Sequence, residues 1–157
     1  MLDTFDGLPV HALVVHATVV LLPLMSIVTI AVAARPAWRR VLATYVAIAD
    51  GLLVPLTFVT IESGERFQAR LSALAGGAEP VAGEHGERGQ LMLYFAIALF
   101  VAGLVVAAFA GRGGVLSVLS LVLAVVVGAG VLGWTFVVGE SGASAVWRET
   151  IANTPDP

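Results

Sequence analysis

Four long apolar stretches limit the fold of this chain more than any other feature of its sequence. Asp50 is the one charged residue inside them, and they cover residues 12–34, 41–61, 91–110 and 115–138. A helix that crosses the ~30 Å hydrocarbon core of a bilayer takes about 20 residues, and each stretch is that long. The sequence therefore predicts an all-α, four-helix transmembrane bundle, in a single integral membrane domain of 157 residues.

The composition excludes several classes of protein. Only 12% of the residues are charged, all eight basic residues are Arg, and Cys is absent. A soluble domain carries about 25% charged residues, so this chain has no nucleic-acid-binding surface, and its main partner is the lipid bilayer. Without Cys it forms no disulfide and no thiolate metal site. Neither a Ser, His and Asp order typical of hydrolases nor a zinc-protease spacing is present, so a hydrolytic enzyme has no support.

The charges indicate how the bundle lies in the membrane. The short connections 35–40 and 111–114 hold four of the eight Arg residues and no acid, whereas ten of the eleven acids lie in residues 1–11, 62–90 and 139–157. Loops rich in Arg stay in the cytoplasm. We therefore expect a multi-pass protein of the inner (plasma) membrane, with both termini on the extracytoplasmic side and the 62–90 loop outside.

Because the two Arg-rich connections are short, the stretches that they join form two antiparallel hairpins. Small residues recur at helical spacing in the second hairpin, where they predict close packing of its two helices. These residues are Gly103, Ala107 and Gly111 in the third stretch, and Ala124, Gly128, Ala129 and Gly133 in the fourth. Pro23 and Pro55 are expected to kink the first and second helices.

The 62–90 loop contains a second apolar pattern. Phe67, Leu71 and Leu74 share one helical face, which predicts a short helix that lies in the headgroup region and ends at Gly76-Gly77.

The three His residues lie near the outer boundary of the bundle, close to carboxylates. His11 opens the first stretch, His16 follows five residues later, His85 precedes the third stretch, and Glu140 ends the fourth. Imidazole and carboxylate groups suit a transition-metal ion, and two imidazoles from facing helices suit the axial positions of one b-type haem. His11 and His16 point about 140° apart on a helix, so they do not share a face. We expect His16 and His85 to bind the cofactor, with His11 and Glu140 completing or orienting the site.

Two other observations concern the interior. Asp50 lies near the middle of the membrane, where desolvation favours a neutral acid, and Ser26 at comparable depth is the expected hydrogen-bond partner. Glu62-Ser63-Gly64 recurs 78 residues later as Glu140-Ser141-Gly142. This repeat hints at duplicated hairpins, although the same offset pairs His85 with Gly7 rather than with a His.

The run Gly7-Leu8-Pro9-Val10-His11, continuing to His16 and Pro23, resembles the opening of a bacterial membrane family called domain of unknown function 2231. The segments Ser63-Gly64-Glu65, 85–89 and 141–147 resemble its later motifs, so the likeness covers nearly the whole chain. Members of the family look like four-span proteins of uncharacterised activity, distantly similar to b-type cytochrome bundles. Glu140 stands where the family pattern has a fourth His, which counts against a second haem.

Together these observations predict a small membrane protein that binds a metal ion or a b-type haem at its outer face. The resemblance implies a redox or metal role without naming one, and we expect an accessory role in respiratory electron transfer, with respiratory-complex subunits or further copies of the chain as partners. The alternative is a structural or interaction subunit without a cofactor, in which the boundary His residues form hydrogen bonds only.

Overall fold

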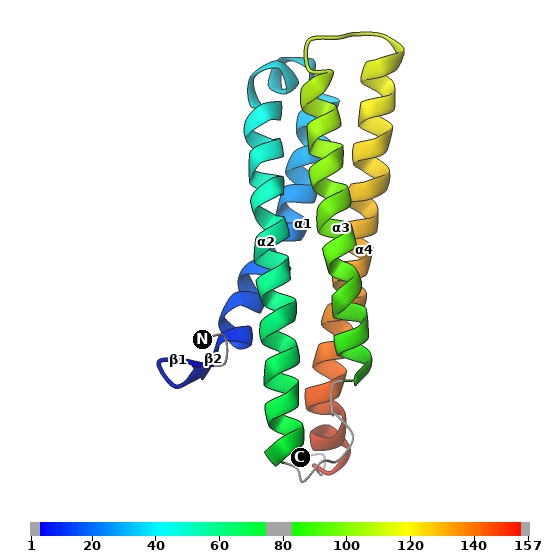
Figure 1. Cartoon of the computed structure of the whole chain (residues 1–157). Coiled ribbons are helices and arrows are strands. Elements are labelled where there is room, and N and C mark those ends of the chain that lie inside the picture. The colour runs from blue at the N-terminus through cyan, green and yellow to red at the C-terminus, as the bar shows by residue number, and fades with distance from the viewer. Residues whose placement is uncertain (1–3, 75–82, 155–157) are drawn as a thin grey trace.

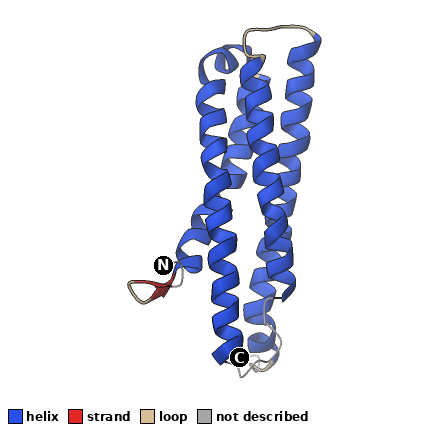
Figure 2. Cartoon of the chain, in the orientation of Figure 1, coloured by secondary structure: helices blue, strands red, loops and turns tan. Residues whose placement is uncertain are grey.

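The computed structural model describes residues 4–74 and 83–154, apart from the side chains of residues 149 and 150. Within these ranges the chain forms four helices and one pair of short antiparallel strands (Figures 1 and 2). They are β1 (Thr4–Phe5), β2 (Leu8–Pro9), α1 (Val10–Ala34), α2 (Pro36–Leu74), α3 (Gly83–Ala108) and α4 (Val115–Ala152). The all-α bundle predicted from the sequence is confirmed, and the strand pair is a small addition to it.

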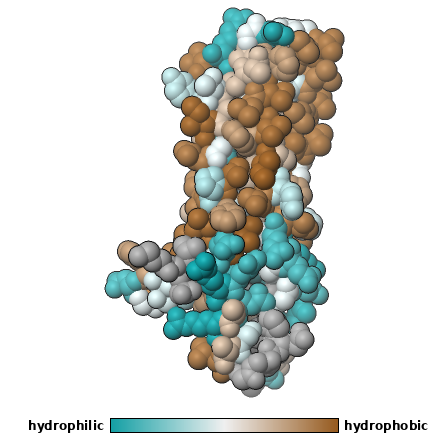
Figure 3. Space-filling model, in the orientation of Figure 1, coloured by the Kyte–Doolittle hydropathy of each residue, from teal (hydrophilic) through white to brown (hydrophobic). Residues whose placement is uncertain are grey.

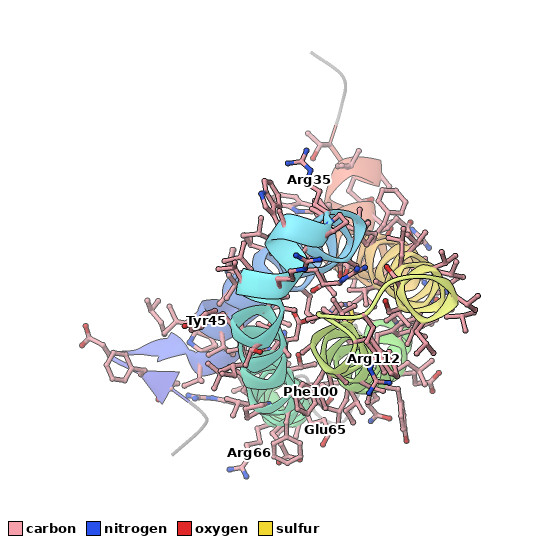
Figure 4. All side chains as sticks on the ribbon, turned by 90° about the horizontal axis from the view of Figure 1, so that it is seen from above. Arg35, Tyr45, Glu65, Arg66, Phe100 and Arg112 are labelled. Carbon is pink, nitrogen blue, oxygen red and sulfur yellow. The ribbon has the colours of Figure 1, made fainter. Side chains whose placement is uncertain are left out.

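The helices form two antiparallel hairpins. Arg35 alone separates α1 from α2, and residues 109–114 connect α3 to α4. Both connections lie at one end of the bundle, here called the loop end, and both chain termini point to the other, here called the terminal end (Figure 1). The helices surround a common axis in chain order, so that α1 contacts α2 and α4 closely but barely meets α3 across the bundle (Figure 4).

All four helices are long and apolar enough to cross a membrane. Apolar side chains cover the flank of the bundle, and polar ones gather around its terminal end (Figure 3). Large apolar residues such as Tyr45, Leu52 and Phe136 are more than half exposed, as expected for a surface that meets lipid rather than water.

The sequence predicted a loop over residues 62–90 that begins with a short helix, but residues 62–74 and 83–90 belong to the two long helices α2 and α3. α2 has 39 residues and runs without interruption to Leu74, and α3 already begins at Gly83. At ~1.5 Å per residue α2 is about 58 Å long, nearly twice the thickness of the hydrocarbon core. Phe67 and Leu71 therefore lie on a continuation of α2 and not on a separate helix in the headgroup plane. The expected end at Gly76-Gly77 lies outside the described residues.

Two of the small residues pack different helices from those predicted. A Cβ atom on Gly103 would lie 2.6 Å from Asp50 Oδ2 and 3.2 Å from the Ala47 Cα, so Gly103 allows α3 to approach α2. A Cβ atom on Gly128 would lie 2.7 Å from Ile30 Cδ1, so Gly128 serves the α1–α4 contact. Gly111 and Gly133 have open space beside them. The prediction that Gly103 and Gly128 pack α3 against α4 was therefore wrong, whereas Ala124 of α4 does share a buried cluster with Val106 of α3.

Pro23 and Pro55 lie inside α1 and α2, and both helices continue past them. The N-terminal part of α1 leans to one side of the bundle together with the strand pair (Figure 1).

Candidate functional site

A cavity of about 310 Å³ opens between the four helices at the terminal end. Its volume lies in the range of small-molecule pockets, and its walls are mainly apolar. His11 and His85 both line it. The cavity is therefore where the structure brings chemistry-bearing side chains together.

His11 lies in the first turn of α1 and is fixed by α2. Its Nδ1 atom is 3.0 Å from the main-chain oxygen of Thr60. Its ring lies directly over Gly64, where an added Cβ atom would be 3.0 Å from the ring. The ring also stacks against Phe67, with centroids 6.4 Å apart. α2 thus supplies an acceptor, a space and an aromatic wall for this imidazole.

His85 lies in the first turn of α3 and is held by α4 in the same way. Its Nδ1 atom is 3.1 Å from the main-chain oxygen of Val138 and 3.2 Å from Ser141 Oγ. An added Cβ atom on Gly142 would lie 2.9 Å from the ring. Since α1 and α3 are diagonal in the bundle, the two His residues reach the cavity from opposite sides.

These contacts extend the repeat seen in the sequence. Ser63 donates to the Thr60 carbonyl and Ser141 donates to the Val138 carbonyl, so the partners of the two His residues correspond as well. Residues of α2 and α4 correspond at an offset of 78, whereas His11 and His85 correspond at 74. The offset of 78 therefore does not extend to His85, because the α3–α4 connection has six residues where the α1–α2 connection has one.

The hydrogen bonds also determine which ring nitrogen is free. A carbonyl oxygen can only accept, so Nδ1 of each ring donates and carries the proton of the neutral imidazole. Nε2 then has the lone pair, and within the described residues no hydrogen bond engages it on either ring. A main-chain carbonyl behind Nδ1 is the usual support of an imidazole that binds a metal through Nε2.

Hydroxyl groups line the deeper part of the cavity. Thr57 and Thr135 occupy equivalent positions on α2 and α4, and each donates to the carbonyl four residues earlier. Thr18 and Thr60 are 2.7 Å apart and bridge α1 and α2. At the mouth, Gln90 donates to Glu65 at 3.0 Å. The cavity is thus polar at its mouth and at several points inside, with apolar walls between them.

The other two predicted ligands lie outside this cavity. His16 is exposed on α1, and its Nδ1 atom bonds to the Ala12 carbonyl of the same helix. Glu140 is exposed on α4, where it accepts a hydrogen bond from Ser144. The structure therefore brings His85 together with His11 and not with His16. The described residues contain no cluster of three or more His, Asp and Glu side chains that could hold a metal ion.

Asp50 is completely buried on α2, 14 residues after its first residue, and its partner differs from the one predicted. Thr29 on α1 donates to Asp50 Oδ2 at 2.9 Å, whereas Ser26 donates to the Leu22 carbonyl of its own helix. Ser26 and Thr29 are almost one turn apart, so sequence depth alone did not distinguish them. Asp50 is separate from the cavity and does not line it.

The family model described as "Predicted membrane protein (DUF2231)" matches residues 7–155. The chain belongs to this family. It is an integral membrane protein, and the resemblance seen in its His and Ser-Gly motifs is confirmed. No curated protein and no solved structure shows significant similarity to the chain.

Proposed function

We propose that the cavity binds one b-type haem, which the imidazoles of His11 and His85 would hold. The observation that carries the proposal is the repeated support of the two imidazoles. Each has its Nδ1–H bonded to a main-chain carbonyl and its ring placed over a glycine. This leaves the lone pair of Nε2 available to bind a metal.

The donor set favours haem over a bare metal ion. A zinc or copper ion needs about four protein ligands, or three and a water. The described residues supply two imidazoles at the cavity and no third His or carboxylate in one cluster. A porphyrin brings four nitrogens of its own, so that two imidazoles from facing helices complete its coordination. The apolar walls of the cavity suit its macrocycle.

A bound haem would supply one-electron redox chemistry at the membrane boundary. The residues of this chain would hold it: the Thr60 and Val138 carbonyls orient the imidazoles and raise their basicity, and the apolar walls exclude water. This supports an accessory role in respiratory electron transfer, alongside subunits of a respiratory complex or a second copy of the chain.

The test is an absorption spectrum with metal analysis, on protein purified in detergent from cells supplied with a haem precursor. We expect a Soret band that shifts on reduction, with one iron per chain. His11→Ala and His85→Ala should each abolish the bis-imidazole spectrum. His16→Ala is the matched control, because this third His is exposed, and it should leave the spectrum unchanged. Stoichiometric zinc or copper without a Soret band would show that the cavity binds a metal ion and not haem. The absence of both a Soret band and a bound metal would refute a cofactor role.

A structural role is the second candidate, and one observation favours it. The His11–Thr60 bond joins α1 to α2, and the His85–Val138 bond joins α3 to α4, so each imidazole clamps a hairpin without any cofactor. If the purified protein holds no cofactor and His11→Ala still lowers its melting temperature, the His residues serve the packing of the bundle.

We also propose that the cavity lies on the extracytoplasmic side of the plasma membrane. Four Arg residues lie at the loop end, and Arg35 and Arg112 mark its edge in Figure 4. Segments rich in Arg remain in the cytoplasm. Because the chain has no Cys, a single Cys introduced at Ala37 or Ala143 reports the side directly. In intact cells an impermeant thiol reagent should label Ala143→Cys and not Ala37→Cys, and the reverse pattern would invert the orientation.

A further inference from the structure

Asp50 is the one acidic side chain that the bundle buries completely within the described residues. It lies on α2 and faces Thr29 of α1 and Gly103 of α3. Thr29 donates to Oδ2 at 2.9 Å, while Oδ1 is buried and has no hydrogen-bond partner among the described residues. The carboxyl group therefore has one polar contact in an otherwise tightly packed place.

Two apolar layers separate Asp50 from both ends of the bundle. Toward the terminal end, Leu53 belongs to a buried cluster with Leu22, Leu99 and Val131. Toward the loop end, Val46 belongs to a second buried cluster with Val32, Val106 and Ala124. No described hydroxyl group links Asp50 to the cavity, because Thr57 and Ser26 both bond to carbonyls of their own helices.

Within the described residues no positively charged side chain pairs with this carboxyl. Its contacts on α1 and α3 are a threonine and a glycine, and the described ion pairs join Arg66 to Glu62 and Arg88 to Glu84. Arg39 lies on the same buried face of α2, eleven residues or about 16 Å away along the helix. Its guanidinium is engaged with the Ala33 and Arg112 carbonyls and with Ser117.

From these contacts we infer that Asp50 is an intramembrane proton-binding site, in which the carboxyl group holds a proton and carries no charge. An ionised carboxylate in such surroundings would have one donor for two oxygens, and an unpaired charge is very costly in an apolar interior. A hard cation does not fit either, since it requires six or more oxygen ligands. Gly103 packs so closely that even a methyl group there would overlap Oδ2.

The site is distinct from the cavity and does not depend on any cofactor. Its ligand is H⁺, and the proton can leave only if one of the two apolar layers opens. Exchange of this proton is therefore tied to movement of the helices against one another, with α1 and α3 as the elements that face the acid.

Infrared difference spectroscopy on the purified protein in lipid tests this inference without requiring a reagent to reach Asp50. A protonated carboxylic acid has a carbonyl stretch that a carboxylate lacks. We expect the wild-type minus Asp50→Asn spectrum at pH 7 to show one such band per chain, shifted slightly in D₂O. Glu62→Gln is the control for a carboxyl near the surface, and its variant should retain the band.

Three results would overturn the inference. Carboxylate bands in place of the carbonyl band would show that Asp50 is ionised. Loss of the band on addition of sodium, calcium or magnesium salts would show a cation site instead. A band that persists in Asp50→Asn would assign the proton to another residue. Since Asn has nearly the same size and can accept the Thr29 hydrogen bond, this variant is expected to fold, and circular dichroism checks that it does.

Discussion

The hairpin α1–α2 and the hairpin α3–α4 build the cavity from the same parts, whereas halfway along the bundle they use different ones. At the terminal end each supplies a His, a serine that bonds a carbonyl, a glycine under the ring and a threonine. In the middle, Asp50 and Thr29 of the first hairpin correspond to Gly128 and Gly103 of the second. The glycines make room for the larger residues opposite them. Symmetry is thus kept where a ligand would bind and lost where the helices pack.

The largest effect should come from filling the space beside Asp50. Gly103→Ala places a methyl group 2.6 Å from Asp50 Oδ2 and against the α2 backbone at Ala47, and overpacking against backbone should cost about 3 kcal/mol of unfolding free energy. Gly128→Ala meets the flexible end of Ile30, so about 1 kcal/mol is expected. Denaturation in detergent measures both. If the two variants lose equal amounts of unfolding free energy, the two hairpins pack alike in the middle of the bundle, and the asymmetry described here is wrong.

A smaller effect is expected at the loop end, where equivalent positions of the two hairpins meet. Arg39 of α2 corresponds to Ser117 of α4, and Arg39 donates to the Ser117 hydroxyl and to the Ala33 and Arg112 carbonyls. Arg39→Ala removes all three bonds and should cost about 2 kcal/mol. Ser117→Ala removes one bond and should cost about half as much or less. A larger loss of unfolding free energy for Ser117→Ala than for Arg39→Ala would contradict the interpretation that Arg39 holds the loop end together through its three hydrogen bonds.

The smallest difference is predicted at the cavity. Gly64→Ala and Gly142→Ala each press a methyl group against an imidazole, at 3.0 Å and 2.9 Å. Because a side chain can move more easily than backbone, each should cost about 1 kcal/mol, and the two costs should agree. The melting temperatures of the two variants provide the comparison. A clear inequality between them would show that the two His supports are not equivalent.

The sequence was sufficient to predict the fold, because a segment that crosses the bilayer must be an apolar helix of about 20 residues. Four apolar stretches with two short Arg-rich connections allow little except two antiparallel hairpins. The helix ends were harder to predict, since polar residues beyond Ile61 mark the edge of the membrane and not the end of α2. Hydropathy reports the surrounding solvent, whereas helix continuation depends on local backbone bonds and packing.

The site was only partly predictable. His11 and His85 were among the candidates, but spacing could not show that His16 faces away from the bundle. The signal that could have found the right pair was the glycine in each Ser-Gly motif, because Gly64 and Gly142 make room for the two rings. Its meaning depends on which helix lies opposite, which is a property of tertiary packing. The same holds for Thr29, which differs from Ser26 in the direction of its hydroxyl.

The single-residue connection at Arg35 and the six-residue connection at 109–114 have a consequence for how such a molecule can diverge. Both hairpins run the same way, so two separate copies of one hairpin could pair about a two-fold axis and enclose a cavity of this kind. In such a dimer every substitution occurs twice, and an acid at position 50 would bring its twin to position 128. Joined in one polypeptide, each half can mutate alone. A single acid in the membrane interior, with glycines at the equivalent positions of the other hairpin, is available only to the fused form.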